Sequence, residues 1–169
     1  YDMYCKLLAE AVAELKGEPI LPDIQTIISL NVNAFIPKDY IVGENYRIEI
    51  YKKIASVESQ QDWYDVYDEI EDRYGEVPAT VSNLLNISLI RSLASTIGIE
   101  EVKQTESGVV FTYSQGTEFD FPTVSKLMKQ FDGKLLFSAG VKPYLTLRHK
   151  GKGLLENVKN MLQAYKQLK

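Results

Sequence analysis

The 169-residue chain has little of what most catalytic and metal sites need, because it contains one cysteine and one histidine. Cys5 cannot form an intrachain disulfide, which fits a reducing compartment and a cytoplasmic protein. A zinc site needs several His or Cys ligands, so no zinc site is expected. No apolar run approaches the roughly 20 residues that span a bilayer, and no signal peptide is visible. The composition thus predicts neither a zinc enzyme, nor a disulfide-rich protein, nor a membrane partner.

The sequence motifs of common enzymes are also missing. There is no Gly-x-x-x-x-Gly-Lys-Ser/Thr loop, no Gly-x-Gly-x-x-Gly loop after a strand, and no Gly-x-Ser-x-Gly nucleophile turn. The stretch Gly151-Lys152-Gly153 at a helix start is a weak phosphate-loop candidate, and an ordinary helix entry is favoured. His149 is interpreted as a surface residue of a basic loop. We therefore expect a non-catalytic chain with no cofactor and no metal.

Charge is unevenly distributed along the chain. Residues 1–122 hold 21 acids and 9 bases, whereas residues 123–169 hold 2 acids and 10 bases. One interpretation is that the basic end neutralises the acidic part. The alternative is a nucleic-acid-binding module that uses the basic end, since a cluster of Lys and Arg is the electrostatic footprint of such modules. The residues of this possible basic patch are Lys142, Arg148, Lys150 and Lys152, with Lys159 and Lys166 beyond them.

The periodicity of apolar residues predicts an α+β fold, with a helical N-terminal half followed by a small antiparallel sheet flanked by helices. A shift in composition near residue 100 indicates a possible subdivision near residue 99. The expected helices cover residues 2–16, 45–57, 60–74, 79–97, 123–131 and 153–169, and the expected strands cover 28–35, 101–105, 109–113, 135–138 and 144–147.

The most informative segment is the expected acidic helix from Asp62 to Gly75. One face is apolar and aromatic, with Val66 at its edge, and the other carries carboxylates. Gly75 and Pro78 end the helix. A rigid helix face lacks the carbonyl oxygens that wrap Ca²⁺, so the face meets either a basic protein surface or only water. The apolar residues are Trp63, Tyr67, Ile70 and Tyr74, and the acids are Asp62, Asp65, Asp68, Glu69 and Asp72.

Five stretches resemble the last domain of the bacterial transcription-repair coupling factors. Residues 34–41 match an A-x-I-P-x-x-Y-I pattern, and residues 68–78 match E-x-x-D-R-[FY]-G-x-x-P. Residues 2–12 resemble the segment that links the motor to that domain. Residues 47–54 and 84–99 resemble two of its helices. The resemblance covers residues 1–115, and residues 116–169 match only in pattern.

The resemblance implies a specific role. The parent would be an ATP-dependent DNA translocase of the bacterial cytoplasm that displaces stalled RNA polymerase and recruits nucleotide-excision repair through UvrA. Residues 1–17 would be the linking helix from the motor, and residues 18–169 the C-terminal regulatory domain. This autoinhibitory domain would pack on a UvrB-like module of the same protein and mask UvrA binding, and DNA would contact the motor rather than this domain. Glu69 and Asp72 match the family's acidic pair at that interface, and Asp65 and Asp68 would extend the pair.

Overall fold

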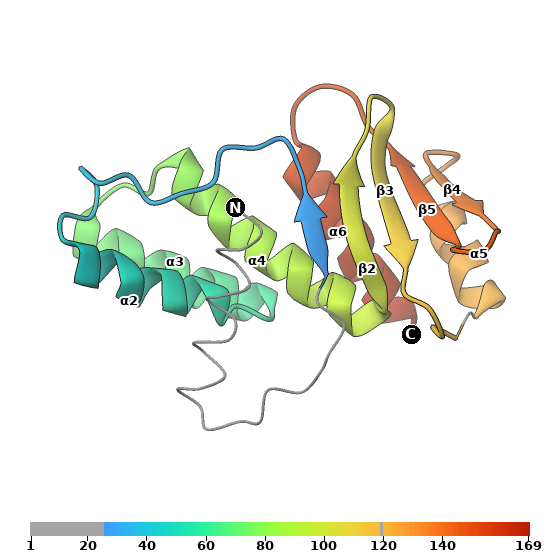
Figure 1. Cartoon of the computed structure of the whole chain (residues 1–169), viewed down its shortest axis with the longest axis horizontal. Helices are drawn as coiled ribbons and strands as arrows, with labels where there is room; N and C mark the ends of the chain where they lie inside the picture. Colours follow the sequence, from blue (N-terminus) through green and yellow to red (C-terminus); the bar gives the residue numbers. More distant parts are fainter. Residues whose placement is uncertain (1–25, 119) are drawn as a thin grey trace. The chain divides into compact units, whose positions relative to one another are not determined.

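The protein has an α+β fold in a computed structural model that describes residues 26–118 and 120–169 (Figure 1). The helix expected over residues 2–16 lies outside these ranges. The fold class is confirmed, and no helix in the described ranges is long and apolar enough to cross a membrane. The elements are β1 (Ile27–Ser29), α2 (Glu44–Ala55), α3 (Gln60–Tyr74), α4 (Ala79–Ile97), β2 (Ile99–Gln104), β3 (Gly108–Tyr113), α5 (Phe121–Gln130), β4 (Leu135–Ser138), β5 (Tyr144–Arg148) and α6 (Leu154–Leu168).

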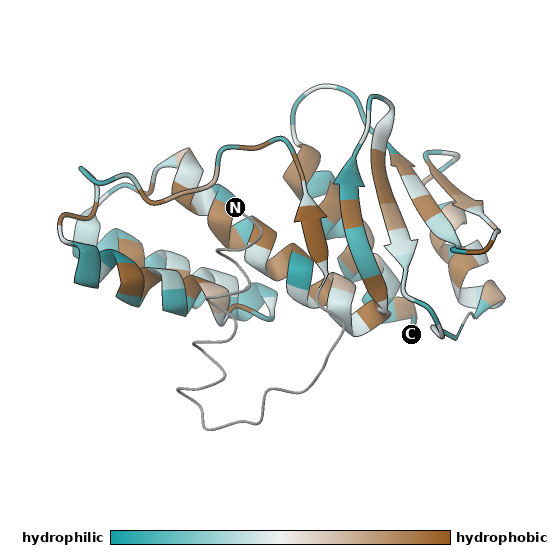
Figure 2. Ribbon diagram, in the orientation of Figure 1, coloured by the Kyte–Doolittle hydropathy of each residue, from teal (hydrophilic) through white to brown (hydrophobic). Residues whose placement is uncertain are grey.

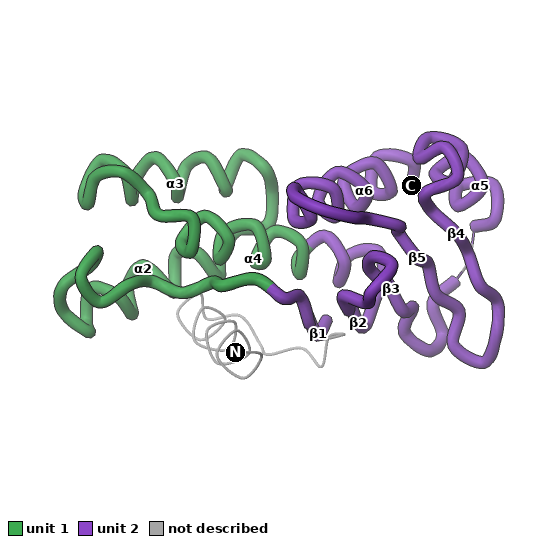
Figure 3. The backbone as a smooth tube through the Cα atoms, turned by 90° about the horizontal axis from the view of Figure 1, so that it is seen from above, with its two compact units in different colours: residues 1–23, 32–92 green, residues 24–31, 93–169 purple. Residues whose placement is uncertain are grey.

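The chain forms two compact units, which Figure 3 shows in different colours. Within the described residues, unit 1 consists of residues 32–92 and unit 2 of residues 26–31 and 93–169. Unit 1 is therefore inserted into unit 2 along the sequence, and the division falls between Ser92 and Leu93, inside α4.

Unit 1 is a helical unit in which α2 and α3 pack around α4. The α4 residues from Leu84 to Ile90 are all buried, as expected for a helix that is mostly apolar on every side. Two of them are polar and have partners. The Ser88 hydroxyl donates to the Ile54 carbonyl oxygen of α2 at 2.8 Å. The Asn86 amide oxygen accepts from the Trp63 indole nitrogen of α3 at 2.9 Å.

The strand expected over residues 28–35 is wrong in extent, because β1 ends at Ser29. The Asn31 backbone N–H donates to the Gln104 side chain, and the Phe35 N–H donates to the Thr80 carbonyl oxygen of α4. The alternation of apolar residues persists in burial, since Ala34 and Ile36 are buried and Phe35 is exposed. The alternating pattern therefore arises because this segment packs on helices of unit 1, and not because it pairs with a strand.

Unit 2 is a five-stranded sheet with the order β1-β2-β3-β5-β4. Its pairs are antiparallel except β1 with β2, which is parallel, so the sheet is mixed where an antiparallel one was expected. Helices α5 and α6 lie on one face (Figure 1). Side chains alternate across the sheet, and hydrophobic and hydrophilic residues alternate along β5 in Figure 2. On the covered face, Val109, Phe111 and Tyr113 of β3 are buried, and Tyr113 shares a 2.7 Å hydrogen bond with the Tyr165 hydroxyl of α6.

Gly108 begins β3, and the backbone of β5 lies close to it. A Cβ atom added there would lie 2.0 Å from the Leu147 carbonyl oxygen and 2.9 Å from the Arg148 Cα. Both atoms are backbone atoms held in the β3–β5 pairing, so neither can move without disrupting the sheet. The residue is glycine for lack of space rather than for turn geometry alone.

We predict that Gly108→Ala lowers the free energy of unfolding by at least about 2 kcal/mol, because overpacking against a fixed backbone is costly. Gly140→Ala is the matched control, since no atom lies within 4 Å of a Cβ there, and we expect a change within about 0.5 kcal/mol. Urea unfolding of both variants measures the difference. Equal stability of the two variants would contradict the close approach of β5.

The buried tyrosine pair predicts a loss of stability in alkali. Burial and the hydrogen bond to Tyr165 raise the pKa of the Tyr113 hydroxyl above its ordinary value of 10.0, and burial also raises the pKa of Tyr165. The folded state thus keeps protons that the unfolded state loses above about pH 10, so this stabilisation is present below pH 10 and lost as the pH rises further. From pH 9 to pH 11, the free energy of unfolding should fall more for the wild type than for the Tyr113→Phe/Tyr165→Phe variant. An equal fall in the wild type and the variant would show that the tyrosine pair does not cause the loss of stability.

Candidate functional site

Helix α3 begins and ends where the sequence predicts. Ser59 is the N-cap, and its hydroxyl accepts the Asp62 backbone N–H at 3.1 Å. The Asp62 carboxylate accepts the Glu58 N–H at 3.1 Å, so two backbone donors at the helix start are satisfied. Gly75 ends the helix with a positive φ of 88°, and its N–H donates to the Glu71 carbonyl oxygen. Asp62 therefore serves as a capping residue.

The back of α3 is apolar and aromatic, as the spacing predicts. Ile70 is fully buried, and Trp63 and Tyr67 are half-buried, with their rings stacked at a centroid distance of 5.0 Å. The Trp63 bond to Asn86 of α4 fixes the rotation of α3 about its axis. At the other end, the Tyr40 hydroxyl donates to the Gly75 carbonyl oxygen at 2.8 Å. Contacts at both ends thus set which residues of α3 face solvent.

Glu69 lies beside the exposed carboxylates of α3 and forms ion pairs within unit 1. Its carboxylate pairs with Lys53 of α2 through a short contact and with Arg73 at 3.6 Å. Glu49 of α2 joins the same network, 3.2 Å from Arg73 and 3.8 Å from Lys53. The hydrogen bond that Arg73 donates to the Glu49 carboxylate raises the pKa of Arg73, which stays charged. Two acids and two bases therefore balance one another between α2 and α3.

The remaining carboxylates of α3 point away from the unit. Asp65, Asp68, Glu71 and Asp72 are exposed, and within the described residues none of them forms an ion pair. Asp65 accepts a hydrogen bond from Gln61 at 2.9 Å. We call these four residues the acidic face. Sequence reasoning missed Glu71, although its position three residues after Asp68 places it on the same side of the helix.

The structure does not gather the predicted basic patch into one surface. Lys142 precedes β5 and pairs with Glu100 at 2.8 Å, whereas Arg148 is the last residue of β5, about 13 Å beyond Tyr144 along the strand. Arg148, at the end of β5, and Lys150 and Lys152, in the connection to α6, are exposed. Lys159 is 5% exposed and pairs with Glu156 at 3.1 Å.

The weaker sequence candidates lie in the same connection. The His149 ring is 3.1 Å from the Asn157 amide nitrogen and 3.1 Å from the Gly151 carbonyl oxygen, so both ring nitrogens have local partners. Gly153 is the N-cap of α6 in a left-handed conformation. Across residues 26–118 and 120–169, no group of three or more His, Cys, Asp or Glu side chains is arranged to hold a metal ion.

Comparison with known proteins gives a consistent result. The family model described as the TRCF domain matches residues 30–124. The transcription-repair-coupling factor of Staphylococcus haemolyticus is 31% identical over 141 residues, which are 81% of this chain and 11% of that protein. The protein of the same name from Staphylococcus epidermidis is 39% identical over 107 residues, which are 61% of this chain and 9% of that protein. The chain thus spans about a tenth of the length of these relatives.

A solved structure shows the same fold. The crystal structure of the C-terminal domain of a transcription-repair coupling factor superposes with a TM-score of 0.76 at 21% sequence identity. The match covers 85% of this chain and 93% of that one.

The two matched acids are predicted to differ in their effect on stability. Glu69→Lys removes one of the two carboxylates that pair with Lys53 and Arg73, so it should destabilise the chain by up to about 1 kcal/mol, a limit set by solvent exposure. Asp72→Lys should change stability by no more than a few tenths of a kcal/mol, in the stabilising direction, because it ends repulsion with Asp68 and suits the C-terminal turn of α3. Urea unfolding at low and high salt tests this, since salt should shrink both effects. Equal destabilisation by the two substitutions would contradict the assignment of Glu69 to the internal network.

Proposed function

The chain belongs to the TRCF domain family, and from this membership we propose that it is a non-catalytic regulatory domain of a transcription-repair coupling factor. The proposed parent is an ATP-dependent DNA translocase that displaces stalled RNA polymerase and recruits nucleotide-excision repair through UvrA. In this proposal the domain packs on a UvrB-like module of the same protein and masks the surface that UvrA binds. The motor would contact DNA, and this domain would not.

The acidic face of α3 is the observation that carries the proposal. Its four carboxylates are exposed, and among residues 32–92 no cation forms an ion pair with them. Asp68 and Asp72 repel one another at a spacing of four residues, and Asp72 stands in the last turn of α3, where the helix dipole disfavours an acid. These costs are removed when Arg or Lys side chains of a partner dock on the face. The arrangement therefore supports a basic partner surface over a solvated one.

Glu69 would take part in this interface in a different way from Asp72. A partner cation near Glu69 must compete with Lys53 and Arg73, which already neutralise that carboxylate. Asp72 has no such competition within the described residues. We therefore expect Asp65, Asp68 and Asp72 to supply most of the attraction, and Glu69 to hold α2 against α3 in the shape that presents them.

The strength of such a contact suits a latch that opens. Exposed ion pairs contribute about 0–1 kcal/mol each. A closed state populated at 99% needs only about 2.7 kcal/mol, which three or four such pairs can supply. The apparent association constant for UvrA would then be the intrinsic constant multiplied by the fraction of molecules that are open. A deeper or more apolar interface would be harder to release.

We predict that Glu69→Lys combined with Asp72→Lys in the full-length protein raises UvrA binding and basal ATPase activity. Loss of about 1–2 kcal/mol from the closed state should raise the open fraction roughly 5–30-fold. The matched control is Glu106→Lys with Glu118→Lys, which makes the same change in net charge at exposed acids of unit 2. Wild-type levels of both UvrA binding and ATPase activity in the α3 variant would overturn the proposal.

A second variant identifies which carboxylates act. Asp68→Lys with Asp72→Lys leaves the network of Glu69, Lys53 and Arg73 intact. If the acidic face binds the module directly, this variant should release UvrA binding at least as strongly as the first. Release by the first variant alone would instead assign the effect to the packing of α2 on α3.

A further inference from the structure

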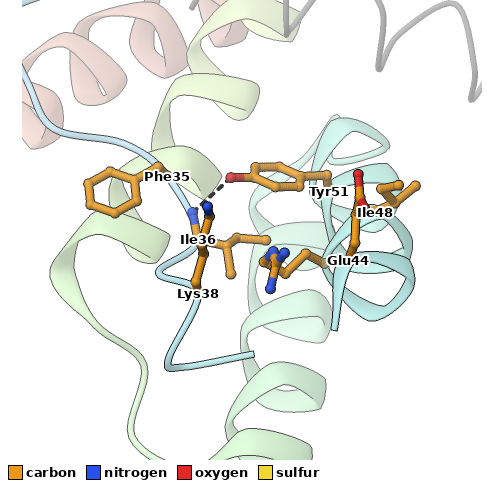
Figure 4. Close-up of a pocket in the computed structure, with 7 residues that line it drawn as sticks. Phe35, Ile36, Lys38, Glu44, Ile48 and Tyr51 are labelled. Carbon is orange, nitrogen blue, oxygen red and sulfur yellow. Dashed lines mark hydrogen bonds between the residues drawn. The ribbon is translucent and has the colours of Figure 1, made fainter. Parts of the chain in front are cut away.

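A second surface of unit 1 has chemistry opposite to that of the acidic face. A hollow of about 510 Å³ opens between the segment after β1 and one side of α2 (Figure 4). In Figure 4, Phe35 lies on one side of the hollow, Glu44 and Ile48 lie on the other, and Ile36 and Lys38 lie between them. The hollow is lined by Phe35, Ile36, Lys38, Glu44, Arg47, Ile48 and Tyr51.

The apolar part of the lining is exposed to water at a cost. Phe35 is 49% exposed and Ile48 is 39% exposed, whereas the nearby Ile36 and Ile50 are buried. Burying apolar surface is favourable by about 25 cal/mol per Å², so these two side chains would gain free energy from a partner that covers them. Phe35 and Ile48, on opposite sides of the hollow, are therefore each suited to contact an apolar side chain of a ligand.

The hollow is fixed by hydrogen bonds that do not involve its exposed side chains. The Ile36 N–H donates to the Tyr51 hydroxyl at 2.9 Å, and the Phe35 N–H donates to the Thr80 carbonyl oxygen at 3.2 Å. The Arg47 guanidinium donates to the Ile41 carbonyl oxygen at 2.9 Å and has further N–H groups for a ligand. A site that is already formed loses little conformational entropy when it binds.

The charge of the lining selects the ligand. Residues 32–92 hold eleven acids and six bases, yet the lining holds two bases, Lys38 and Arg47, and one acid, Glu44. Within the described part of the chain, neither base forms an ion pair. Glu44 lies in the first turn of α2, where the helix dipole stabilises it. The excess positive charge beside an apolar wall matches a ligand that has an apolar group next to a carboxylate.

We propose that this hollow binds a short acidic segment of a partner protein, with one apolar side chain, Leu or Phe, against Phe35, a second against Ile48, and a neighbouring carboxylate on Lys38 and Arg47. Two cations are too few for a phosphate-rich polymer, and the concave lining suits a side chain better than a membrane surface. The interaction is separate from the docking of the acidic face, because it takes a partner of the opposite charge.

The test is a titration of the ¹⁵N-labelled 169-residue chain with the blocked peptide acetyl-Asp-Leu-Phe-Asp-amide, followed by NMR. We expect saturable shifts of the backbone amides of Phe35, Ile36, Arg47 and Ile48. Lys38→Glu and, separately, Phe35→Ser should each weaken binding about tenfold or more. The matched controls are Lys52→Glu and Tyr46→Ser, which change a cation and an exposed aromatic residue of α2 outside the lining, and both should bind like the wild type.

Several results would overturn the proposal. One is the absence of localised shifts at millimolar peptide, and another is equal binding of acetyl-Lys-Leu-Phe-Lys-amide, which would remove the role of the cations. Localised binding of anilinonaphthalene sulfonate without binding of the peptide would assign the hollow to small amphiphiles. Binding of the chain to phosphatidylglycerol vesicles, lost in Phe35→Ser, without peptide binding would assign it to a membrane. Unchanged peptide affinity in Lys38→Glu would exclude the carboxylate contact.

Discussion

The buried polar groups of α4 constrain the rest of unit 1. A helix buried on all sides by apolar contacts alone would tolerate several rotations of its neighbours, because apolar packing is not directional. Asn86 and Ser88 remove that freedom, since an unpaired polar group in such a place costs about 1–3 kcal/mol. Asn86 accepts a hydrogen bond from the Trp63 indole of α3, and Ser88 donates one to the Ile54 carbonyl oxygen of α2. Two hydrogen bonds thus set the orientation of two helices.

The solvent-facing chemistry follows from those orientations. With Trp63 held inward, the positions three, four and seven residues apart on the far side of α3 are Asp65, Asp68 and Asp72. With Ile54 and Ile50 held inward, α2 presents Arg47, Ile48 and Tyr51 to the hollow. Two surfaces of opposite charge therefore result from one buried helix. Neither surface needs a loop of special conformation, so no short sequence motif marks the hollow.

The sequence predicts elements well where one local pattern decides the structure. Helix α3 has a Ser cap, a two-sided pattern and a Gly stop, and both of its ends are correct. Helix α4 is likewise predicted from Ala79 to Ile97. The errors occur where distant residues decide. The β1 segment alternates as far as Phe35, yet only its start finds a strand partner, which is β2, about seventy residues later. The reason for Gly108 lies in Leu147, which is also remote in sequence.

The acidic face shows the same division between local and distant information. Helical spacing predicts that the carboxylates share a side, and the structure agrees for Asp65, Asp68 and Asp72. It cannot predict the ion pair of Glu69 with Lys53, because Lys53 belongs to another helix. Ion pairs also involve two lysines of the basic end, and its use in binding nucleic acid stays a prediction. Lys142 and Lys159 each have an acidic partner, and that for Lys142 is 42 residues away in sequence.

The insertion of unit 1 between β1 and β2 has a consequence for the order of folding. The pair Ile27 and Glu101 closes a loop of more than seventy residues, and closure of so long a flexible loop is slow and entropically unfavourable. All of residues 32–92 leave the ribosome before β2 does, and their contacts are largely within α2, α3 and α4. If these helices fold first, the flexible part of the loop becomes far shorter. β1 would then be the last strand to join a sheet whose other four strands, all from residues 99–148, can pair as soon as they are made.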